Sequence, residues 1–332
     1  MKPSILIRKS LARPLYALSR TGAIFGGRTC GDFVILMFHR IVRKQPSEPW
    51  IQEGMYVDPE TFDRQVRFLK ERFHVASLAG VPRLMSLHPG RNTNRPHCML
   101  TFDDGWKDFH EFAFPILKSH GVEATVFLPT DFIGTAKRFW TDRLAVLLTG
   151  IESRRNDRGI AAGRPDPLID GIEGLKGPAE ARMEKAIELL KPLPSEEIDH
   201  VLEALAEKWG IDSEGTGGSF LSWEEIREMR RSGIVSFGSH TRSHRILTTV
   251  SEDVAREELI RSRERLLAEG AVSPSFIPFA YPNGNHDDRI ADLVAEAGYD
   301  LAVTTESGWN DFGNPARERF KLKRIGIHQD MA

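Results

Sequence analysis

Residues 97–128 read HCMLTFDDGWKDFHEFAFPILKSHGVEATVFL, and this stretch decides the fold class. It begins with the apolar run His97–Phe102, which is typical of a strand buried on both faces. A helical pattern over Phe109–Ser119 follows, Gly121 ends that pattern, and Ala124–Leu128 is a second apolar run. A strand, a helix and a strand at this spacing predict a parallel crossover, and therefore an α/β fold.

The same alternation continues on both sides of this stretch. Further strands are predicted at Phe33–Phe38, Ile234–Phe237, Phe276–Tyr281, Leu301–Thr304 and Leu322–Ile327. Helices are predicted from Asp58-Pro59-Glu60, from the capping box of Ser222 and Glu225, over Ser251–Glu269 and over Asp287–Ala297. This rhythm favours one α/β barrel over residues 32–332.

Residues at about 134–220 interrupt the rhythm. A helix is predicted around Leu144–Leu148, a loop over Arg154–Pro167, and two acidic helices near Ala179–Leu190 and Ser195–Trp209. We interpret the whole as a helical insertion. This insertion could shape or cover a functional site. Alternatively, it has no part in catalysis, and the sequence is compatible with both interpretations.

Composition excludes several classes of protein. The chain has 332 residues, of which 40% are hydrophobic and 28% charged, so it has enough apolar side chains for a core. Two cysteines provide neither a disulfide framework nor a four-thiolate metal site. No stretch approaches the ~18 apolar residues of a membrane span. The net charge of −2 gives no general attraction to nucleic acid, and we expect no nucleic-acid partner.

Residues 1–31 form a basic leader. Six basic residues precede the first acidic residue, Asp32, with apolar residues between them. Arg8, Lys9, Arg13 and Pro14 interrupt every apolar run, so we predict no signal peptide, which needs ~7–15 unbroken apolar residues. The expected location is the cytoplasm, with peripheral contact of residues 1–30 at the inner face of the membrane. The alternative is a leader that packs on the barrel or stays loose.

Four polar clusters follow predicted strands: His39, Asp103-Asp104, His240 with His244, and Tyr281–Gly284. In parallel α/β folds, functional side chains gather at the carboxyl ends of the strands. We therefore expect the four clusters to converge on one face of the barrel.

The pair His240 and His244 can bind one metal ion if it lies on a helix or a tight turn, because residues i and i+4 then share a face. An isolated pair with this spacing is also common as surface histidines. A carboxylate at another strand end would complete a site with coordination positions left open for water and substrate. Such a donor set suits zinc, cobalt, nickel or iron.

Asp103 and Asp104 are adjacent carboxylates, which are costly if both are buried without partners. A division of roles accommodates them: one aspartate binds the metal, and its neighbour serves as a base for water. Gly105 allows a sharp turn beside them. The alternative is an ordinary solvated turn.

At this point the sequence resembles a known family, the polysaccharide deacetylases (carbohydrate esterase family 4, or NodB-homology enzymes). Thr101-Phe-Asp-Asp-Gly105 and Ser239-His-Thr-Arg-Ser-His244 match its first two motifs, and Phe279-Ala-Tyr-Pro-Asn-Gly284 is similar to the third. Leu36-Met-Phe-His-Arg-Ile41 resembles the N-terminal strand of a permuted subgroup that includes exopolysaccharide deacetylases. The resemblance covers about Phe33 to Ile327, apart from the insertion.

The resemblance implies a distorted (β/α)7 barrel that removes N-acetyl groups from amino sugars with a divalent metal, for which zinc is the first expectation. By motif position, the resemblance implies that the metal ligands are Asp104, His240 and His244 and that the general base is Asp103. It also implies that the general acid is His39 and that the third-motif loop, including the Tyr281 backbone amide, binds the oxyanion.

The sequence also departs from the family pattern. Many members have an arginine in the third motif that tethers the base, whereas Phe279 and Ala280 carry no charge; Arg324 or another arginine is the expected substitute. Arg245 replaces a frequent proline, and it either favours an anionic substrate or is solvated. Trp106 either stacks on a sugar ring or packs in the protein.

The expected partner is an N-acetylated saccharide, either a poly- or oligosaccharide or a lipid-linked or nucleotide-linked precursor. A cytoplasmic enzyme favours the precursor, because it cannot reach a finished extracellular polymer. One alternative is hydrolysis of another non-peptide C–N bond on the same barrel. The other is a non-catalytic saccharide-binding or assembly protein, which would not need the base and all three ligands.

Overall fold

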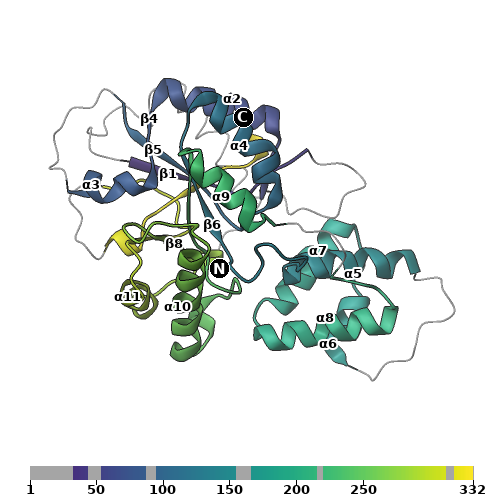
Figure 1. Ribbon diagram of the computed structural model, residues 1–332. Coiled ribbons are helices and arrows are strands. Elements are labelled where there is room, and N and C mark those ends of the chain that lie inside the picture. Colours follow the sequence, from purple (N-terminus) through teal and green to yellow (C-terminus); the bar gives the residue numbers. More distant parts are fainter. Residues whose placement is uncertain are drawn as a thin grey trace. The chain divides into compact units, whose positions relative to one another are not determined.

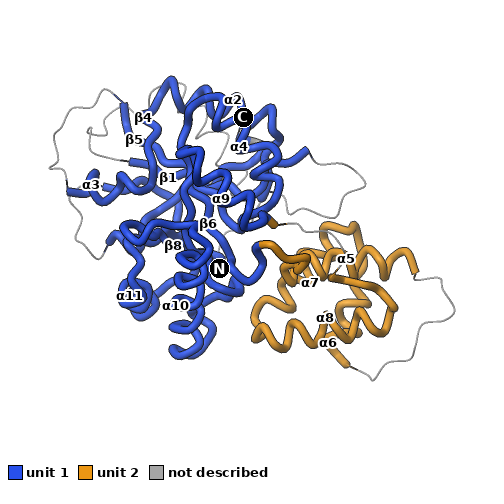
Figure 2. The backbone as a smooth tube through the Cα atoms, in the orientation of Figure 1, with its two compact units in different colours: residues 1–43, 53–133, 221–332 blue, residues 44–52, 134–220 orange. Residues whose placement is uncertain are grey.

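The computed structural model describes residues 33–43, 54–86, 95–154, 166–214, 220–311 and 318–331. The predicted leader over 1–31 lies outside these residues. The described chain forms two compact units, which Figure 2 distinguishes by colour. Unit 1 contains the described residues up to Arg43, from 54 to 133 and from 221 onward, and unit 2 contains those from 134 to 220.

Unit 1 is built on a parallel sheet with the strand order β10-β1-β5-β6-β7-β8-β9 (Figure 1). The strands are β1 (Phe33–Phe38), β5 (His97–Phe102), β6 (Ala124–Leu128), β7 (Val235–Ser239), β8 (Pro278–Ala280), β9 (Leu301–Val303) and β10 (Ile325–Gly326). The two-residue strand β4 (His74–Val75) pairs with β5 outside this path, and β2 (Arg40–Ile41) pairs with β3 (Tyr56–Val57) in a separate ladder. The sequence predicts seven strands in this unit. Each of them coincides with or overlaps one of the seven strands of the path.

The sheet curls toward closure. Val303 at the end of β9 makes a parallel bridge with Leu322, which lies three residues before β10. β10 in turn pairs with β1, where Leu36 lies opposite Ile325. The two edges of the strand path therefore approach one another, and the strands form a curled, barrel-like sheet rather than an open one. This is the parallel α/β architecture that the sequence predicts.

Helices follow the strands (Figure 1). They are α2 (Pro59–Arg72), α3 (Val81–Met85), α4 (Phe114–His120), α9 (Trp223–Arg231), α10 (Glu252–Ala268) and α11 (Asp288–Glu296). The sequence patterns predict all of them except α3. Short turns of helix are η1 (Leu78–Gly80), η3 (Leu247–Thr249), η4 (Pro282–Gly284), η5 (Glu318–Phe320) and η6 (Gln329–Met331). The capping box is present, since Ser222 Oγ accepts from the Glu225 amide while Glu225 Oε2 accepts from the Ser222 amide.

The helix predicted at Phe109–Ser119 is present but irregular. Its first part, η2 (Phe109–Ala113), is a π-helix, and α4 continues from it with Pro115 in its first turn. Gly121 ends α4 in the left-handed conformation, with φ of 61°. This π-helical turn, which begins at Phe109 shortly after Asp103 and Asp104, is of a kind that is frequent at functional sites.

The core of unit 1 lies between the sheet and its helices. Phe33 and Ile35 of β1, Met99 of β5 and Phe127 of β6 are completely buried. Val34 of β1 and Leu100 of β5 point to the opposite face of the sheet and are only 2% and 1% exposed. Both faces of these strands are therefore covered, which explains why their sequences are continuous apolar runs instead of alternating ones.

Unit 2 is helical and has its own hydrophobic core. It contains α5 (Trp140–Arg154), α6 (Pro167–Glu173), α7 (Ala179–Leu190) and α8 (Ser195–Trp209). The helix α6 is not predicted by the sequence pattern, because it is short and contains Gly171. Asp166 caps it by accepting from the Leu168 and Ile169 amides. Whether this unit acts as an insertion that serves the site stays a prediction.

A membrane-spanning helix is not found in the described part of the chain, where every helix is too short or too polar to cross a bilayer.

We predict that Gly238→Ala destabilises unit 1. A Cβ at this position of β7 would lie 2.5 Å from the Pro278 carbonyl oxygen and 2.8 Å from the Phe127 ring. Overpacking of this kind costs about 1–3 kcal/mol, to be measured as unfolding free energy in urea. Gly80→Ala is the matched control, because its Cβ would meet nothing within 4 Å. Equal stability of the two variants would contradict the packing described for β7.

Candidate metal centre and active site

The turn after β5 separates two adjacent carboxylates. Asp104 and Gly105 both adopt left-handed backbone conformations, with φ of 76° and 64°. This conformation is unfavourable for a residue other than glycine. A side chain at Gly105 would also meet Leu128 at 2.8 Å and Ile133 at 3.0 Å. The turn therefore requires Gly105, and it gives Asp103 and Asp104 different partners.

Asp103 forms a buried bidentate ion pair with Arg324. The Arg324 Nη1 and Nη2 groups each donate to one Asp103 oxygen at 2.7 Å. Arg324 is completely buried, and its other donors reach Thr304 O at 2.8 Å and Thr101 Oγ1 at 3.2 Å. Burial opposes ionisation of Asp103, but the charge and hydrogen bonds of Arg324 outweigh burial and hold its pKa below the ordinary value. Asp103 is thus a fixed carboxylate.

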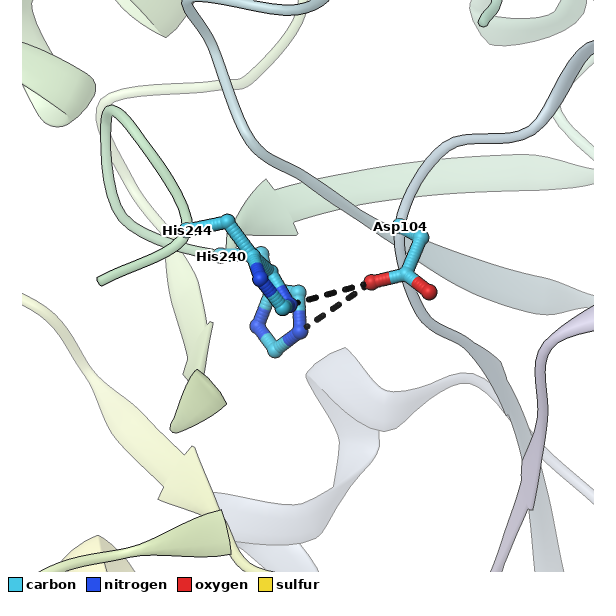
Figure 3. Close-up of side chains that lie close together, drawn as sticks. All are labelled: Asp104, His240 and His244. Carbon is cyan, nitrogen blue, oxygen red and sulfur yellow. Dashed lines mark ion pairs between the residues drawn. The ribbon is translucent and has the colours of Figure 1, made fainter. Parts of the chain in front are cut away.

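Asp104 faces the two histidines instead. Its Oδ1 lies 3.5 Å from His240 Nε2 and 3.3 Å from His244 Nε2, and Figure 3 shows both rings directed at this oxygen. Among the described residues, Asp104, His240 and His244 are the one group of three metal-binding side chains whose ligand atoms all lie within 4.8 Å of one another. The predicted metal ligands are therefore brought together.

These donors fit a divalent metal. Ligand atoms at about 2.0–2.2 Å from one tetrahedral ion lie roughly 3.3–3.6 Å apart, which is the spacing that Asp104 keeps from both rings. His240 Nδ1 donates to Ala280 O at 2.8 Å, which leaves its Nε2 as the free lone pair. Burial lowers the pKa of His240 to about 4, so the ring is neutral at pH 7 as a metal ligand must be.

Trp106 supports Asp104 and is not a platform open to solvent. Its Nε1 donates to Asp104 Oδ2 at 3.1 Å, and only 7% of the residue is exposed. The Arg40 guanidinium covers its ring at 4.7 Å from the centroid. Of the two alternatives from the sequence, this placement favours packing, because little ring surface is left for a sugar. Its hydrogen bond to Asp104 could not be read from the sequence.

His39 lies beside Asp103. It follows β1, which pairs in register with β5, and its Nε2 is 3.9 Å from Asp103 Oδ2. Its side chain is 14% exposed, so it is not sealed inside the barrel. The next residue, Arg40, donates to Asp108 Oδ2 at 2.7 Å, and Asp108 Oδ1 accepts from the Ile41 amide at 3.0 Å. This buried acid, which sequence reasoning missed, fixes the chain next to His39.

Tyr281 is placed differently from the other predicted residues. Its side chain is completely buried, and its hydroxyl donates to Phe320 O at 2.9 Å. Its backbone amide donates to Val303 O at 3.2 Å. Both donors are engaged inside the barrel, and the amide would have to share or leave this bond to serve an oxyanion. The oxyanion role of Tyr281 therefore stays a prediction without support from its contacts.

The comparisons with known proteins agree with this geometry. The sequence model of one family, polysaccharide deacetylase, matches residues 90–155 and 176–302. These ranges contain both aspartates, both histidines and Tyr281, but neither His39 nor Arg324. No match was found among curated protein sequences.

Several solved structures share the fold. Streptococcus pyogenes deacetylase PplD in complex with acetate has a TM-score of 0.57 at 22% identity, over 92% of this chain and 96% of that one. IcaB from Ammonifex degensii has a TM-score of 0.55 at 16% identity, over 91% and 94%. The de-N-acetylase from Aggregatibacter actinomycetemcomitans has 0.51 at 15%, over 90% and 95%. At these identities the likeness concerns the fold, and it identifies the curled sheet as a NodB-type deacetylase barrel.

We predict that Arg324→Gln in the metal-free protein lowers the unfolding free energy by about 3–5 kcal/mol, because it leaves the Asp103 carboxylate buried and unpaired. Adding Asp103→Asn should restore most of this loss, since the double variant buries no unpaired charge. Urea denaturation of both variants measures the difference. Arg289→Gln, at an exposed arginine, is the control. Additive losses in the double variant would contradict a coupled pair.

Proposed function

The chain belongs to the polysaccharide deacetylase family, and we propose on this premise that it is a metal-dependent hydrolase of N-acetylated amino sugars. Family membership places it among hydrolases of C–N bonds other than peptide bonds, with de-N-acetylation as the reaction. The metal dependence and the site roles are proposed from one observation: the two adjacent aspartates of the turn after β5 have different partners. Asp104 meets His240 and His244, while Asp103 is held as a carboxylate by Arg324.

Asp104, His240 and His244 would hold the metal. Bound there, a divalent cation lowers the pKa of water and polarises the acetyl carbonyl. Zinc is the first candidate, and cobalt, nickel and iron suit the same donors. The Ala280 carbonyl and the Trp106 indole orient His240 and Asp104 for this task, as such outer partners do in metal sites.

Asp103 is proposed as the general base. A base must be ionised at the working pH, and Arg324 keeps the pKa of Asp103 low. The same ion pair fixes the orientation of both oxygens, so the carboxylate can accept a proton from the attacking water without reorganising. Arg324 therefore takes the tethering position that Phe279 and Ala280 leave without a charge, although it comes from the far end of the chain.

His39 is proposed as the general acid. Breaking the C–N bond leaves an amine nitrogen that needs a proton, and an imidazole is suited to supply one near neutral pH. His39 lies 3.9 Å from Asp103, so acid and base sit on one side of the site. A proton taken by Asp103 thus has a short path back toward the leaving group. This role agrees with the resemblance of residues 36–41 to the permuted subgroup.

The proposed substrate is an N-acetylated poly- or oligosaccharide or its lipid-linked or nucleotide-linked precursor. The cytoplasmic location and the membrane contact through residues 1–30 stay predictions, since those residues lie outside the described ranges. Arg245 follows the proposed ligand His244 in the sequence. That its positive charge favours an anionic substrate also stays a prediction. The following assays test the metal dependence of the reaction and the proposed roles of Asp103 and His39.

The first assay measures acetate released from N-acetylglucosamine oligomers by protein loaded with Zn²⁺. We expect turnover, loss of turnover with a chelator, and recovery on adding metal back. Asp103→Asn should lower kcat by about 10²–10⁴-fold, the usual contribution of a general base, while still binding metal. Asp253→Asn, at an exposed aspartate on α10, is the matched control. Undiminished activity of Asp103→Asn would rule out the base assignment.

A second assay separates the acid from the base. His39→Gln should lower kcat by about 10²-fold with little change in KM. Because a general acid serves the leaving group, the loss should be much smaller on a phenyl acetate, whose phenolate departs without a proton. An equal loss on both substrates would show that His39 does not protonate the leaving group.

A further inference from the structure

Glu258 is a buried acid outside the proposed catalytic set. It lies on α10, which contacts β7, the strand that leads into His240 (Figure 1). Only 1% of Glu258 is exposed. A buried carboxylate is strongly unfavourable unless hydrogen bonds and opposite charge compensate for the lost hydration. Its partners therefore show what it stabilises.

All three short hydrogen bonds of Glu258 go to the residues between the two histidines. Its Oε2 accepts from the Arg242 amide at 3.0 Å and from the Ser243 amide at 2.8 Å. Its Oε1 accepts from Ser243 Oγ at 2.6 Å, and Arg242 Nε lies 3.6 Å away. One carboxylate thus binds the middle of the 240–244 segment.

This segment needs such support, because it is not a helix. Thr241 and His244 have φ of 65° and 61°, in the left-handed region that residues other than glycine avoid. In a helix, the backbone alone would place residues i and i+4 on one face; in this irregular turn, it does not. The convergence of His240 and His244 on Asp104 therefore depends on outside contacts.

α10 supplies such a contact at the start of the segment as well. Ser262, one turn after Glu258 on α10, hydrogen-bonds to Ser239 Oγ at 2.7 Å. Ser239 Oγ in turn accepts from the Thr241 amide at 3.2 Å. The helix consequently contacts the segment directly at Arg242 and Ser243 and through Ser239 at Thr241.

We infer that Glu258 is a positioning residue that sets the distance between His240 and His244 before a metal arrives. This inference rests on the proposed function, because it assumes that the two histidines bind a metal. It predicts that Glu258 affects metal affinity without being a ligand. Loss of a group that orients ligands typically weakens metal binding by about 10–100-fold.

The test measures the Zn²⁺ dissociation constant of the metal-free full-length protein by competition with a chromophoric chelator. Glu258→Gln should weaken Zn²⁺ binding about 10–100-fold, because the neutral side chain loses the charge that strengthens its hydrogen bonds with the Arg242 and Ser243 amides and its attraction to the Arg242 guanidinium. Glu257→Gln is the matched control: Glu257 is exposed and pairs with the outer guanidinium of Arg242. It should bind Zn²⁺ like the wild type.

Ser243→Ala keeps the inference testable if Glu258→Gln does not fold. It removes only the Oγ–Oε1 bond, so we expect a smaller loss of affinity in the same direction. Unfolding midpoints of the metal-free variants are measured in parallel. Lower stability with unchanged Zn²⁺ affinity in both variants would overturn the inference and leave Glu258 a structural residue. A wild type that does not bind Zn²⁺, Co²⁺, Ni²⁺ or Fe²⁺ would instead overturn the proposed function, and this inference with it.

Discussion

The ion pair between Arg324 and Asp103 is the interaction on which the site depends. Two charges are removed from water here, which is favourable only if every donor and acceptor finds good geometry. Arg324 meets this condition by binding Asp103 with two nitrogens and by donating to Thr101 and to the Thr304 carbonyl. These partners lie on or just after β5 and β9, which are not neighbours in the sheet. The pair therefore ties opposite parts of the curled sheet together at the proposed base.

A second constraint follows at the next residue. If Asp104 pointed as Asp103 does, two carboxylates would compete for one guanidinium and each would raise the pKa of the other. The left-handed turn at Asp104 and Gly105 prevents this by directing Asp104 to His240 and His244. Backbone conformation thus separates the proposed base from the proposed metal ligand, which are adjacent residues.

Much of this could be predicted from the sequence, because the relevant signals are local. Apolar runs identify strands buried on both faces, and polar residues at their carboxyl ends identify the face where Asp104, His240 and His244 meet. Element bounds such as Phe33–Phe38 and His97–Phe102 were predicted without error, since both are uninterrupted runs. The strand order that parallel crossovers impose predicted that a carboxylate would join His240 and His244. The choice of Asp104 over Asp103 came from the family resemblance.

What could not be predicted depends on side-chain direction and on distant contacts. From the sequence, Arg324 is one expected substitute for the missing arginine, but the chain has many arginines, and only the fold shows that Arg324 is the one that reaches Asp103. The Trp106 indole could face a substrate or the protein, and only its bond to Asp104 decides for the protein. Glu258 did leave a signal: it is an acid on the helix face that also carries Ala255 and Leu259, both buried. A charged residue on such a face indicates a buried partner but not which one.

The central claim is that Asp104, His240 and His244 form one metal centre beside a fixed base. Anomalous diffraction at the zinc absorption edge, from crystals of the Zn²⁺-loaded protein, tests it most directly. The account predicts a peak within coordination distance of Asp104 Oδ1 and of Nε2 of both histidines, with Asp103 still paired to Arg324. An absent peak at this position, or a Zn²⁺ ion bound by Asp103 instead of Asp104, would contradict it.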